Sequence, residues 1–536
     1  MYSGVNDPEQ WVLPSVIEEQ AARRGHSPAI SMVNGETLTY AQLADAASRV
    51  AGFYVSLGVE PGDRIAIMAP NGLDFTCAWA GAGRLGVTAV LLNTELMGSF
   101  LEHPLVDSAP GILVIHEAWL DRLADLDEAL SSIRHVVVVG QSIPTNPAWI
   151  AFDRWRDASP FRGNLPKASD IACIMYTSGT TGAPKGVLMP HAHCFLFGLG
   201  VVENLSVTPD DHYYICLPLF HANGLLMQLG AVLIAGCGAT IRERFSGTAW
   251  LSDIRSSGAT VTHSLGAISA FVMAQPERPD DRTHRLRLIF SAPNHPDHES
   301  AWRDRFGIAE VVGGYGMTES NIPLYGDRND PRPGTCGKVW ARCFEVEIRD
   351  PDTDLPVPLG EVGEIMVRPR IGQAFMAGYN GLPDKTVEAW RNLWFHTGDA
   401  ARMADDGYVT LVDRIKDCIR RRGENISAPH VEEVLAALPG VAEVAAFAVP
   451  SDVRGGEDEI MLAVVRLPAS SIGPQEVQAH ARDHLPRFAQ PRYLAFVEAL
   501  PKTGTEKVRK VELRRIGLTP DTIDLENKPF ERTGLS

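Results

Sequence analysis

Residues 176–187 read Tyr-Thr-Ser-Gly-Thr-Thr-Gly-Ala-Pro-Lys-Gly-Val and form the most distinctive stretch of the chain. Gly179 and Gly182 permit backbone conformations that are closed to other residues, so successive amides can converge on an anion. The ammonium group of Lys185 adds positive charge, and hydroxyl donors come from Thr177, Ser178, Thr180 and Thr181. This composition predicts a loop that binds a polyphosphate.

The loop differs from the Walker A pattern of P-loop proteins. That pattern places Ser or Thr directly after its lysine, whereas Lys185 lies between Pro184 and Gly186. A different nucleotide-binding fold is therefore expected. A loop of Ser, Thr and Gly is also compatible with an ordinary surface turn, so the rest of the chain must decide between the two.

Length and composition indicate a large globular protein, with which an enzyme is compatible. A chain of 536 residues is longer than one hydrophobic core supports, so two or more domains are expected. Its 45% hydrophobic and 21% charged residues are ordinary for a globular protein. The formal net charge of −17 makes nucleic acid an improbable partner.

The cysteines and the N-terminus indicate a cytoplasmic location. The eight cysteines are scattered singly, with no CxxC pair, which favours reduced thiols. The first 25 residues lack a basic start followed by an apolar block. The longest apolar stretch, near residues 225–241, is interrupted by Gln228 and by glycines, so no integral membrane segment is expected.

Hydrophobic periodicity predicts an α/β fold. An amphipathic helix is expected over residues 38–57 and a buried strand over 64–68. The same alternation favours parallel sheets covered by helices, with further strands near 86–93, 111–115, 135–139, 259–263 and 287–290.

The predicted secondary structure changes after about residue 330. Short strands with turn signals between them are predicted at 344–349, 363–367 and 408–412, which indicates a small β-rich subdomain. Beyond residue 414 a helix at 431–438 and strands at 441–449 and 460–467 predict a second compact domain. The residues from about 519 onward look like a polar tail.

Four further motifs make the chain recognisable. They are Gly-Gly-Tyr-Gly-Met-Thr-Glu-Ser at 313–320, Trp-Phe-His-Thr-Gly-Asp at 394–399, Asp-Arg-Ile-Lys-Asp at 413–417 and Pro-Lys-Thr-Gly-Thr-Glu-Lys at 501–507. With the loop at 176–187 they resemble, in order and spacing, the motif series of the adenylate-forming superfamily. Residues 93–96, 391–399 and 420–427 are most similar to the crotonobetaine/carnitine-CoA ligase-like acyl-CoA synthetases.

The resemblance implies a fold and a reaction. The fold is α/β, with a large N-terminal domain (1–414) of parallel α/β subdomains plus a small β-barrel-like subdomain. A small mobile α+β domain (415–536) follows, with a hinge at Lys416. In the reaction a carboxylate attacks the α-phosphate of ATP with Mg²⁺, giving an acyl-adenylate and pyrophosphate. Coenzyme A then displaces AMP.

The resemblance also assigns the nucleotide contacts. Tyr315 would stack on adenine, Thr318 would contact phosphate, and Glu319 would bind the magnesium ion. Asp399 would accept hydrogen bonds from both ribose hydroxyls, because a carboxylate has two acceptor oxygens. Further contacts would come from Gly316, Met317, Ala292, Pro293 and Arg414.

Other residues would serve the acid, the thiol and the change between the two steps. Lys507 resembles the mobile lysine that reaches the α-phosphate during adenylation, and Lys502 in the same motif does not. Gly423 and Glu424 would lie on the thiol-binding face. His221 resembles the gate between acid pocket and thiol tunnel. The pocket itself would include His221, Asn223, Gly224, Gly313 and Gly314.

The acid is poorly specified by the sequence. Glycines in the pocket segments, among them Gly224, Gly313 and Gly314, leave volume for a bulky acid, although they can equally serve backbone packing. A homodimer and a monomer are both compatible with the chain.

One departure leaves an alternative reaction open. His430 stands where the nearest branch usually has glutamate, and Pro429 precedes it. If these residues disfavour the adenylating orientation, the protein would perform only thiolation of a supplied acyl-adenylate. A neutral change at an exposed helix start is the other interpretation. Acyl transfer to a carrier-protein phosphopantetheine uses the same fold and also stays open.

Overall fold

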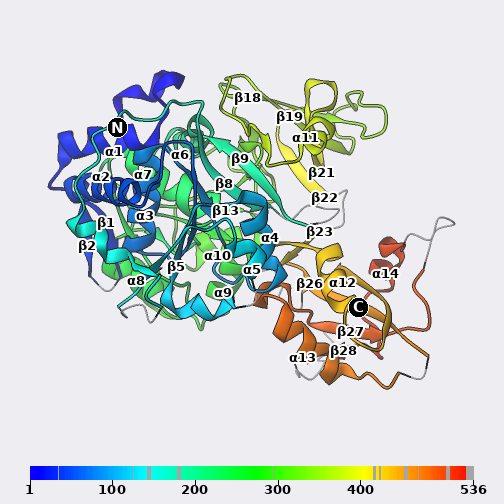
Figure 1. Ribbon diagram of the computed structural model, residues 1–536. Coiled ribbons are helices and arrows are strands. Elements are labelled where there is room, and N and C mark those ends of the chain that lie inside the picture. The colour runs from blue at the N-terminus through cyan, green and yellow to red at the C-terminus, as the bar shows by residue number, and fades with distance from the viewer. Residues whose placement is uncertain are drawn as a thin grey trace. The chain divides into compact units, whose positions relative to one another are not determined.

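The computed structural model of the protein describes residues 1–33, 35–124, 126–141, 146–177, 183–292, 294–414, 418–421, 424–451, 457–468, 470–501 and 508–526 (Figure 1). Its contacts divide the chain into two units. Unit 1 contains residues 1–94, 104–176 and 186–413. Unit 2 contains 414–536 together with two short segments of the N-terminal half, 95–103 and 177–185.

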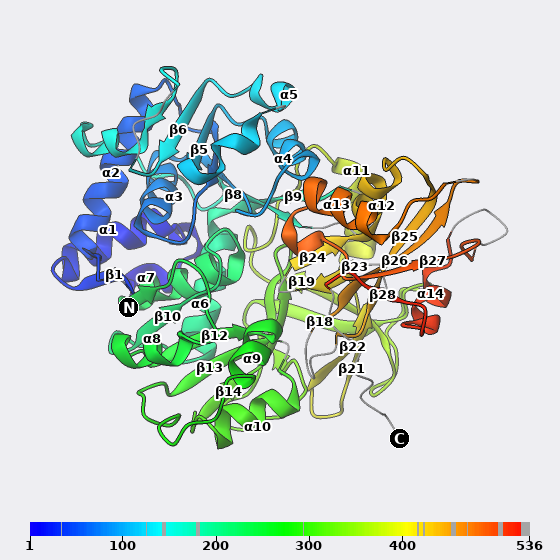
Figure 2. The same ribbon diagram turned by 90° about the horizontal axis from the view of Figure 1, so that it is seen from below.

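Unit 1 is built around two sheets of mainly parallel strands (Figures 1 and 2). The first sheet has the order β20-β9-β8-β4-β3-β5-β6-β7. Its strands from β8 to β7 pair in parallel. In sheet order the bounds are Gly378–Tyr379, Lys185–Pro190, Ile171–Thr177, Thr88–Leu91, Arg64–Met68, Ile112–His116, His135–Val139 and Ile150–Ala151. The strands predicted at 64–68 and 135–139 are confirmed to the residue.

The second sheet has the order β14-β13-β12-β10-β11-β1-β2. Every printed pair is parallel except β1 with β2, at the edge. In sheet order the bounds are Glu310–Val312, Leu288–Ala292, Val261–Leu265, His212–Ile215, Gly238–Ile241, Pro28–Met32 and Thr37–Thr39. These two sheets confirm the predicted α/β class.

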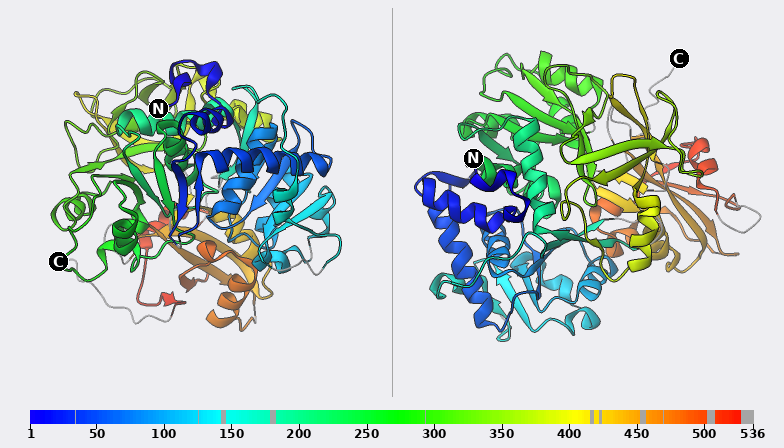
Figure 3. Two further views of the ribbon diagram at one scale, coloured as in Figure 1. Left: turned by 90° about the vertical axis from the view of Figure 1, so that its left-hand side faces the viewer. Right: turned by 90° about the horizontal axis from the view of Figure 1, so that it is seen from above.

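Helices cover the sheets because their apolar faces must be buried. Helix α2 (Tyr40–Ser56) begins with a capping box between Thr39 and Gln42, and α1, α2 and α3 pack side by side, as Figure 3 shows from two further sides. The α-helices of unit 1 are α1 Leu13–Arg24, α2 Tyr40–Ser56, α3 Leu73–Leu85, α5 Asp127–Leu130, α6 His191–Asn204, α7 Gly230–Ala235, α8 Trp250–Ser257, α9 Gly266–Met273, α10 Pro296–Asp304 and α11 Pro383–Ala389. Helix α4 runs from Ser99 to Ser108.

The structure also contains shorter helical segments of other types. The 3₁₀ helices are η1 Ser3–Asn6, η2 Pro8–Gln10, η3 Glu117–Leu123, η4 Phe152–Asp157, η6 Arg391–Leu393 and η7 Arg487–Ala489. A π-helix, η5, spans Asn223–Leu229 and continues directly into α7. Among the described residues, none of the helices has the length and apolar character needed to cross a bilayer.

The β-rich part predicted after residue 330 is present in unit 1. Four strands form a sheet in the order β18-β19-β21-β22, with the bounds Phe344–Arg349, Gly363–Pro369, Phe395–Met403 and Val409–Arg414. Buried and half-buried residues alternate along β18, as expected for a strand with one face on the core. A separate sheet contains β15 Gly314–Met317, β16 Asn321–Tyr325 and β17 Lys338–Val339.

Unit 2 has an α+β arrangement. A hairpin of β23 (Cys418–Arg421) and β24 (Glu424–Ser427) precedes a four-stranded sheet, β25-β26-β27-β28. The strands of that sheet are Val441–Val449, Glu459–Arg466, Tyr493–Phe496 and Ile523–Asp524, and the helices are α12 Ala428–Ala436, α13 Pro474–His484 and α14 Lys510–Ile516. The prediction of a polar tail from 519 is wrong in part, because β28 pairs with β27 and Leu525 is buried.

His430 is not at an exposed helix start. Its side chain is only 6% exposed, and its ring stacks on that of Phe100 in unit 2, with 3.6 Å between the centroids. Ser427 caps α12 by accepting a hydrogen bond from the His430 amide at 3.4 Å. Pro429 lies in the first turn, where the helix has no partner for an amide hydrogen. The expectation that His430 lies at an exposed position is therefore wrong.

Candidate functional site

A tight hairpin presents Thr318 and Glu319. Strands β15 and β16 are antiparallel, and the two residues lie in the turn that joins them. Asn321 closes the turn with a φ of +65°, a conformation that asparagine tolerates better than most residues. A Cβ atom at Gly316 would lie 2.1 Å from the carbonyl oxygen of Asn321, so only glycine allows the two strands to approach this closely.

The Glu319 carboxylate is buried and oriented by a tyrosine. Its side chain is 4% exposed, and the hydroxyl of Tyr379 donates to Oε1 at 3.1 Å. The amide of Met376 donates to the Glu319 carbonyl at 3.3 Å. Burial, followed by the charge of Glu319, raises the pKa of Tyr379, which keeps its proton available as a donor. Sequence reasoning missed Tyr379, which lies sixty positions from Glu319.

The buried side chain of His193 contacts the backbone of Thr318. His193 in α6 contacts the Thr318 carbonyl through Nε2 at 2.8 Å. Burial lowers the pKa of His193 to about 4, so the imidazole is neutral near pH 7. A carbonyl oxygen only accepts, so the proton is on Nε2. The side-chain amide of Asn321 donates a hydrogen bond to the His193 carbonyl oxygen at 3.0 Å. This bond connects α6 to β16, the second strand of the hairpin.

Because His193 is buried and neutral, we expect the folded protein to lose stability in acid. In the unfolded chain His193 takes up a proton near pH 6.5, but in the folded protein only near pH 4. The stability it contributes is therefore complete above pH 6.5 and falls as the pH drops toward 4, by up to about 1.4 kcal/mol per pH unit. Urea midpoints measured between pH 4.5 and 7.5 should show a shallower slope for His193→Gln than for the parent. The exposed His26→Gln is the matched control, and an equal slope in all three proteins would contradict the assignment.

A second pair of predicted site residues meets in the interior. The hydroxyl of Tyr315 in β15 donates to Oδ2 of Asp399 in β21 at 2.7 Å, although the two residues are 84 positions apart. Both are buried, at 9% and 5% exposure. The structure thus brings together the residue predicted to stack on adenine and the one predicted to bind ribose.

Glu364 and its neighbours fix the backbone that leads into Asp399. Oε1 of Glu364 accepts from the Gly398 amide at 2.7 Å, and Oε2 lies 3.2 Å from Nδ1 of His396. The Asp399 amide donates to the hydroxyl of Thr397 at 3.2 Å. Sequence reasoning missed Glu364, because it lies in a different strand of the sheet from the motif it supports.

Two more predicted residues follow the carboxyl ends of neighbouring parallel strands. Ala292 ends β13, and Gly313 directly follows β14. In open α/β sheets ligands bind outside this edge. Tyr315, Gly316 and Met317 continue from the same edge into β15. The nucleotide residues predicted in unit 1 therefore cluster at the edge where this class of fold binds ligands.

The predicted acid-pocket residues lie near the start of the π-helix. The amide of His221 donates to the Pro218 carbonyl at 3.2 Å, and its ring lies 4.6 Å from that of Phe220. Asn223 begins η5. A Cβ atom at Gly224 would lie 2.3 Å from the Pro218 carbonyl oxygen, so glycine is required here for chain packing.

The other pocket glycines also serve packing. A Cβ atom at Gly313 would lie 2.9 Å from the Thr335 carbonyl oxygen, and one at Gly314 would lie 2.6 Å from the Phe290 ring. The space that these glycines leave is thus filled by the protein itself. They give no support to the expectation of a bulky acid, and the packing interpretation is the one the structure favours.

Several predicted residues lie outside the described residues or belong to unit 2. The predicted residues outside the described part of the chain are Ser178, Gly179, Thr180, Thr181, Pro293, Lys416, Gly423 and Lys507, and the side chain of Arg414 also lies outside it. Among the predicted residues that belong to unit 2, Thr177 ends β8, Lys185 begins β9 and Glu424 begins β24. The polyphosphate loop, the hinge and the adenylating lysine stay predictions.

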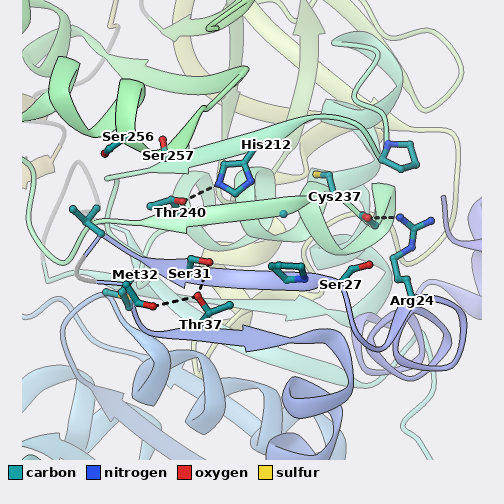
Figure 4. Close-up of a pocket in the computed structure, with 16 residues that line it drawn as sticks. Arg24, Ser27, Ser31, Met32, Thr37, His212, Cys237, Thr240, Ser256 and Ser257 are labelled. Carbon is teal, nitrogen blue, oxygen red and sulfur yellow. Dashed lines mark hydrogen bonds between the residues drawn. The ribbon is translucent and has the colours of Figure 1, made fainter. Parts of the chain in front are cut away.

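A hollow of about 570 Å³ lies elsewhere in unit 1 (Figure 4). It surrounds the first residues of β1, β10 and β11, which are Pro28, His212 and Gly238. His212 points toward Thr240, with 2.8 Å between Nε2 and Oγ1. None of the predicted site residues lines this hollow, and β12 separates its strands from β13 and β14, which precede Pro293 and Gly313 in the chain.

The chain is similar to known enzymes over nearly its whole length. A crotonobetaine/carnitine–CoA ligase of Salmonella paratyphi A is 28% identical over 484 residues, which cover 89% of this chain and 93% of the relative. ATP-bound MatB of Rhodopseudomonas palustris has a TM-score of 0.69 at 27% identity, over 94% of this chain and 98% of that one. The amide bond synthetase McbA of Marinactinospora thermotolerans has a TM-score of 0.80 at 25% identity, over 94% and 99%.

The family assignment rests on two matches to family models. The model described as AMP-binding enzyme matches residues 17–380, and that of the AMP-binding enzyme C-terminal domain matches residues 430–507. The first match contains both the hairpin with Glu319 and the loop at 176–187. The chain therefore belongs to the AMP-binding enzyme family, which is the adenylate-forming superfamily that its motifs resemble.

Proposed function

We propose that the protein is an AMP-forming acyl-CoA ligase, which activates a carboxylic acid with ATP and transfers the acyl group to coenzyme A. The observation that carries the proposal is the buried hydrogen bond between Tyr315 and Asp399. It joins an aromatic face and a carboxylate, which are the two groups that an adenosine moiety requires, at the carboxyl edge of a parallel sheet. The similarity to CoA ligases supports the same conclusion.

The first step needs stabilisation of negative charge. When the acid attacks the α-phosphate, charge develops on the phosphoryl oxygens, so preorganised donors and cations lower the barrier. We assign this role to Thr318, Lys185, Lys507 and the hydroxyl-rich loop. In the second step the thiol attacks the acyl carbon and AMP leaves.

A magnesium ion fits the buried carboxylate of Glu319. Mg²⁺ is usually held by one or two carboxylates, with the phosphates and waters completing the coordination. Among the described residues no three His, Cys, Asp or Glu side chains form a metal-binding group. A phosphate-bridging Mg²⁺ does not need one. The ion would neutralise phosphate charge, and Glu319 would hold it in place while Tyr379 orients the carboxylate.

Replacing Glu319 with glutamine should therefore change the magnesium requirement. We expect pyrophosphate release by Glu319→Gln to fall about 100-fold and to need more Mg²⁺ for half-maximal rate, since a neutral amide is a poorer ligand for a hard cation. Tyr379→Phe removes only the orienting donor and should cost less than about tenfold. A Mg²⁺ titration of Glu319→Gln that matches the parent would exclude Glu319 as a ligand.

We further propose that residues 415–536 form the mobile domain and that Lys416 is its hinge. A hinge must absorb a large backbone rotation so that one domain can serve two steps. Proline at position 416 should slow the overall reaction, because it fixes φ. We also assign the protein to the cytoplasm, because its cysteines are scattered singly, as is usual for proteins that keep reduced thiols.

The acyl acceptor decides between the remaining alternatives. The similarity to crotonobetaine/carnitine–CoA ligases does not favour the thiolation-only interpretation. Carrier-protein phosphopantetheine, or an amine as in the amide bond synthetase, would use the same acyl-adenylate. Mass spectrometry of reactions that contain an acid, ATP and coenzyme A, a phosphopantetheinylated carrier or an amine should show the CoA thioester as the main product. A product from the carrier or the amine alone would overturn the assignment of coenzyme A.

A further inference from the structure

His263 is a fully buried residue of β12 that the reaction scheme does not use. Its side chain is 0% exposed, and burial lowers its pKa to about 3, so the imidazole is neutral. Nδ1 lies 2.9 Å from Oδ1 of Asn223. An amide oxygen only accepts and a neutral imidazole carries one N–H group, so the proton is on Nδ1. The other ring nitrogen, Nε2, is therefore an acceptor, and it has no hydrogen-bond partner among the described residues.

Gln228 supplies a second acceptor of the same kind. Its Nε2 donates to the same oxygen of Asn223 at 3.3 Å, which leaves Oε1 at the other end of the amide. The side chain is 0% exposed, and Oε1 also has no hydrogen-bond partner among the described residues. Two donors on one oxygen agree with the proton assignment on His263.

The π-helix explains why these groups meet. Residues Asn223 and Gln228 are five positions apart, and a π-helix pairs residues at this spacing. In an α-helix the neighbours on one face are three or four positions apart, so the same sequence would separate the two side chains. The irregular helix thus gathers both amides on the face that meets His263.

The residues that carry the two acceptors contact the segments assigned to the acid pocket. On one side is Asn223, to which both residues are hydrogen-bonded. On the other side the ring of His263 lies 4.9 Å from that of Phe290, and the Phe290 ring abuts Gly314. His263 therefore connects two predicted pocket segments that are about ninety positions apart in the chain.

We propose that Nε2 of His263 and Oε1 of Gln228 bind a hydrogen-bond donor on the acid, so that the substrate is a carboxylic acid with a hydroxyl or an uncharged amino group. This inference rests on the proposed acyl-CoA ligase function and on its acid pocket. A buried acceptor without a donor is costly, and an acid that supplies the donor removes that cost. Both acceptors are uncharged, which suits a neutral donor better than an ammonium group.

Matched acids test the proposal. We would compare 3- and 4-hydroxybenzoate and 3- and 4-aminobenzoate with the methyl and methoxy counterparts, and 3-hydroxybutanoate with butanoate. The methoxy acids accept hydrogen bonds but do not donate them. For at least one scaffold, kcat/KM for pyrophosphate release should be about 10- to 100-fold higher for the donor acid than for both counterparts. Titration calorimetry of each acid, without ATP, should show the same order.

Variants of His263 and Gln228 test whether these two residues cause the preference for donor acids. His263→Phe keeps the ring and Gln228→Met keeps the length, and each should reduce the ratio of donor acid to methyl acid to within about threefold of unity. Release with the methyl acid should persist, which also shows that the variant is folded. His191→Phe is the matched control, because His191 is also buried, at 3% exposure, begins α6, and has an Nε2 atom without a hydrogen-bond partner among the described residues.

The outcomes separate this inference from the proposed function. Pyrophosphate release without a donor preference, or a preference for methoxy acids, would overturn the inference and leave the ligase function intact. A donor preference in calorimetry without release for any acid would support the inference and contradict the ligase function. A ratio that His263→Phe and Gln228→Met leave unchanged, or the absence of binding for every acid, would also overturn the inference.

Discussion

Lys507→Ala should lose adenylation and retain thioester formation. With ATP, Mg²⁺ and the best acid of a panel, we expect pyrophosphate release to fall about 100- to 1000-fold, the effect of removing one preorganised group from developing charge. With preformed acyl-adenylate and coenzyme A, we expect the rate of thioester formation to stay within about threefold of the parent. The reason is that Lys507 is assigned to the first step alone, because the C-terminal domain presents another face in the second.

Lys502→Ala is the matched control for this split. Lys502 lies five positions earlier in the same motif and has the same side chain and charge. Both half-reactions should be unchanged in this variant. Equal losses in the two half-reactions of Lys507→Ala would contradict the assignment to adenylation. Equal losses in the two lysine variants would indicate a general effect of charge near the end of the domain.

Asp399→Asn should weaken the use of ATP more than that of the acid. The carboxylate can accept two ribose hydroxyl groups, and hydrogen bonds to a charged group contribute about 1.5 to 3 kcal/mol each. Asparagine keeps one acceptor and loses the charge, so we expect kcat/KM for ATP to fall about 100-fold. Initial rates of pyrophosphate release, with ATP and acid varied separately, measure this effect.

Tyr315→Phe separates the ribose contact from the buried hydrogen bond. It keeps an aromatic face for adenine but removes the hydroxyl that donates to Asp399. Kinetics should change less than tenfold, because the carboxylate retains its acceptors for ribose. If Tyr315→Phe were as defective as Asp399→Asn, the tyrosine hydroxyl rather than the ribose contact would be the essential feature. An Asp399→Asn enzyme with normal kcat/KM for ATP would remove Asp399 from the nucleotide site.

Sequence patterns predicted the local features of this fold well. Strands such as β3 and β6 are short apolar runs that follow a single polar residue, and their bounds could be read from the sequence. Thr318 and Glu319 could be named through the resemblance of the contiguous motif at 313–320, whereas the hairpin of β15 and β16 that presents them was not predicted. Tyr315 and Asp399 could be named only through the resemblance, and the structure adds the bond between them.

The supporting residues could not be found in this way. His193 lies 125 positions from Thr318, and Tyr379 lies sixty positions from Glu319, so only tertiary packing brings each pair together. Neither stands in a local motif that differs from an ordinary core residue. The π-helix that pairs Asn223 with Gln228 follows no hydrophobic period either, because its register differs from that of an α-helix.

The pocket glycines and His430 show a limit of sequence patterns. The residue type at a position, even compared with a family's pattern, does not show what fills the space around it. Gly224 and Gly314 are required by a carbonyl oxygen and by an aromatic ring that approach their Cα atoms. His430 is buried against the Phe100 ring, so its replacement of glutamate has a packing role in unit 2.

Acid-dependent formation of AMP and pyrophosphate tests the central claim most directly. The purified protein would be incubated with Mg-ATP, coenzyme A and a panel of acids that includes the matched hydroxy, amino, methoxy and methyl acids, and the nucleotides and thioesters would be quantified together. We predict AMP, pyrophosphate and acyl-CoA in equal amounts for at least one acid, and none without acid. Formation of ADP and phosphate, or acyl-CoA without ATP cleavage, would contradict the assignment of an AMP-forming acyl-CoA ligase.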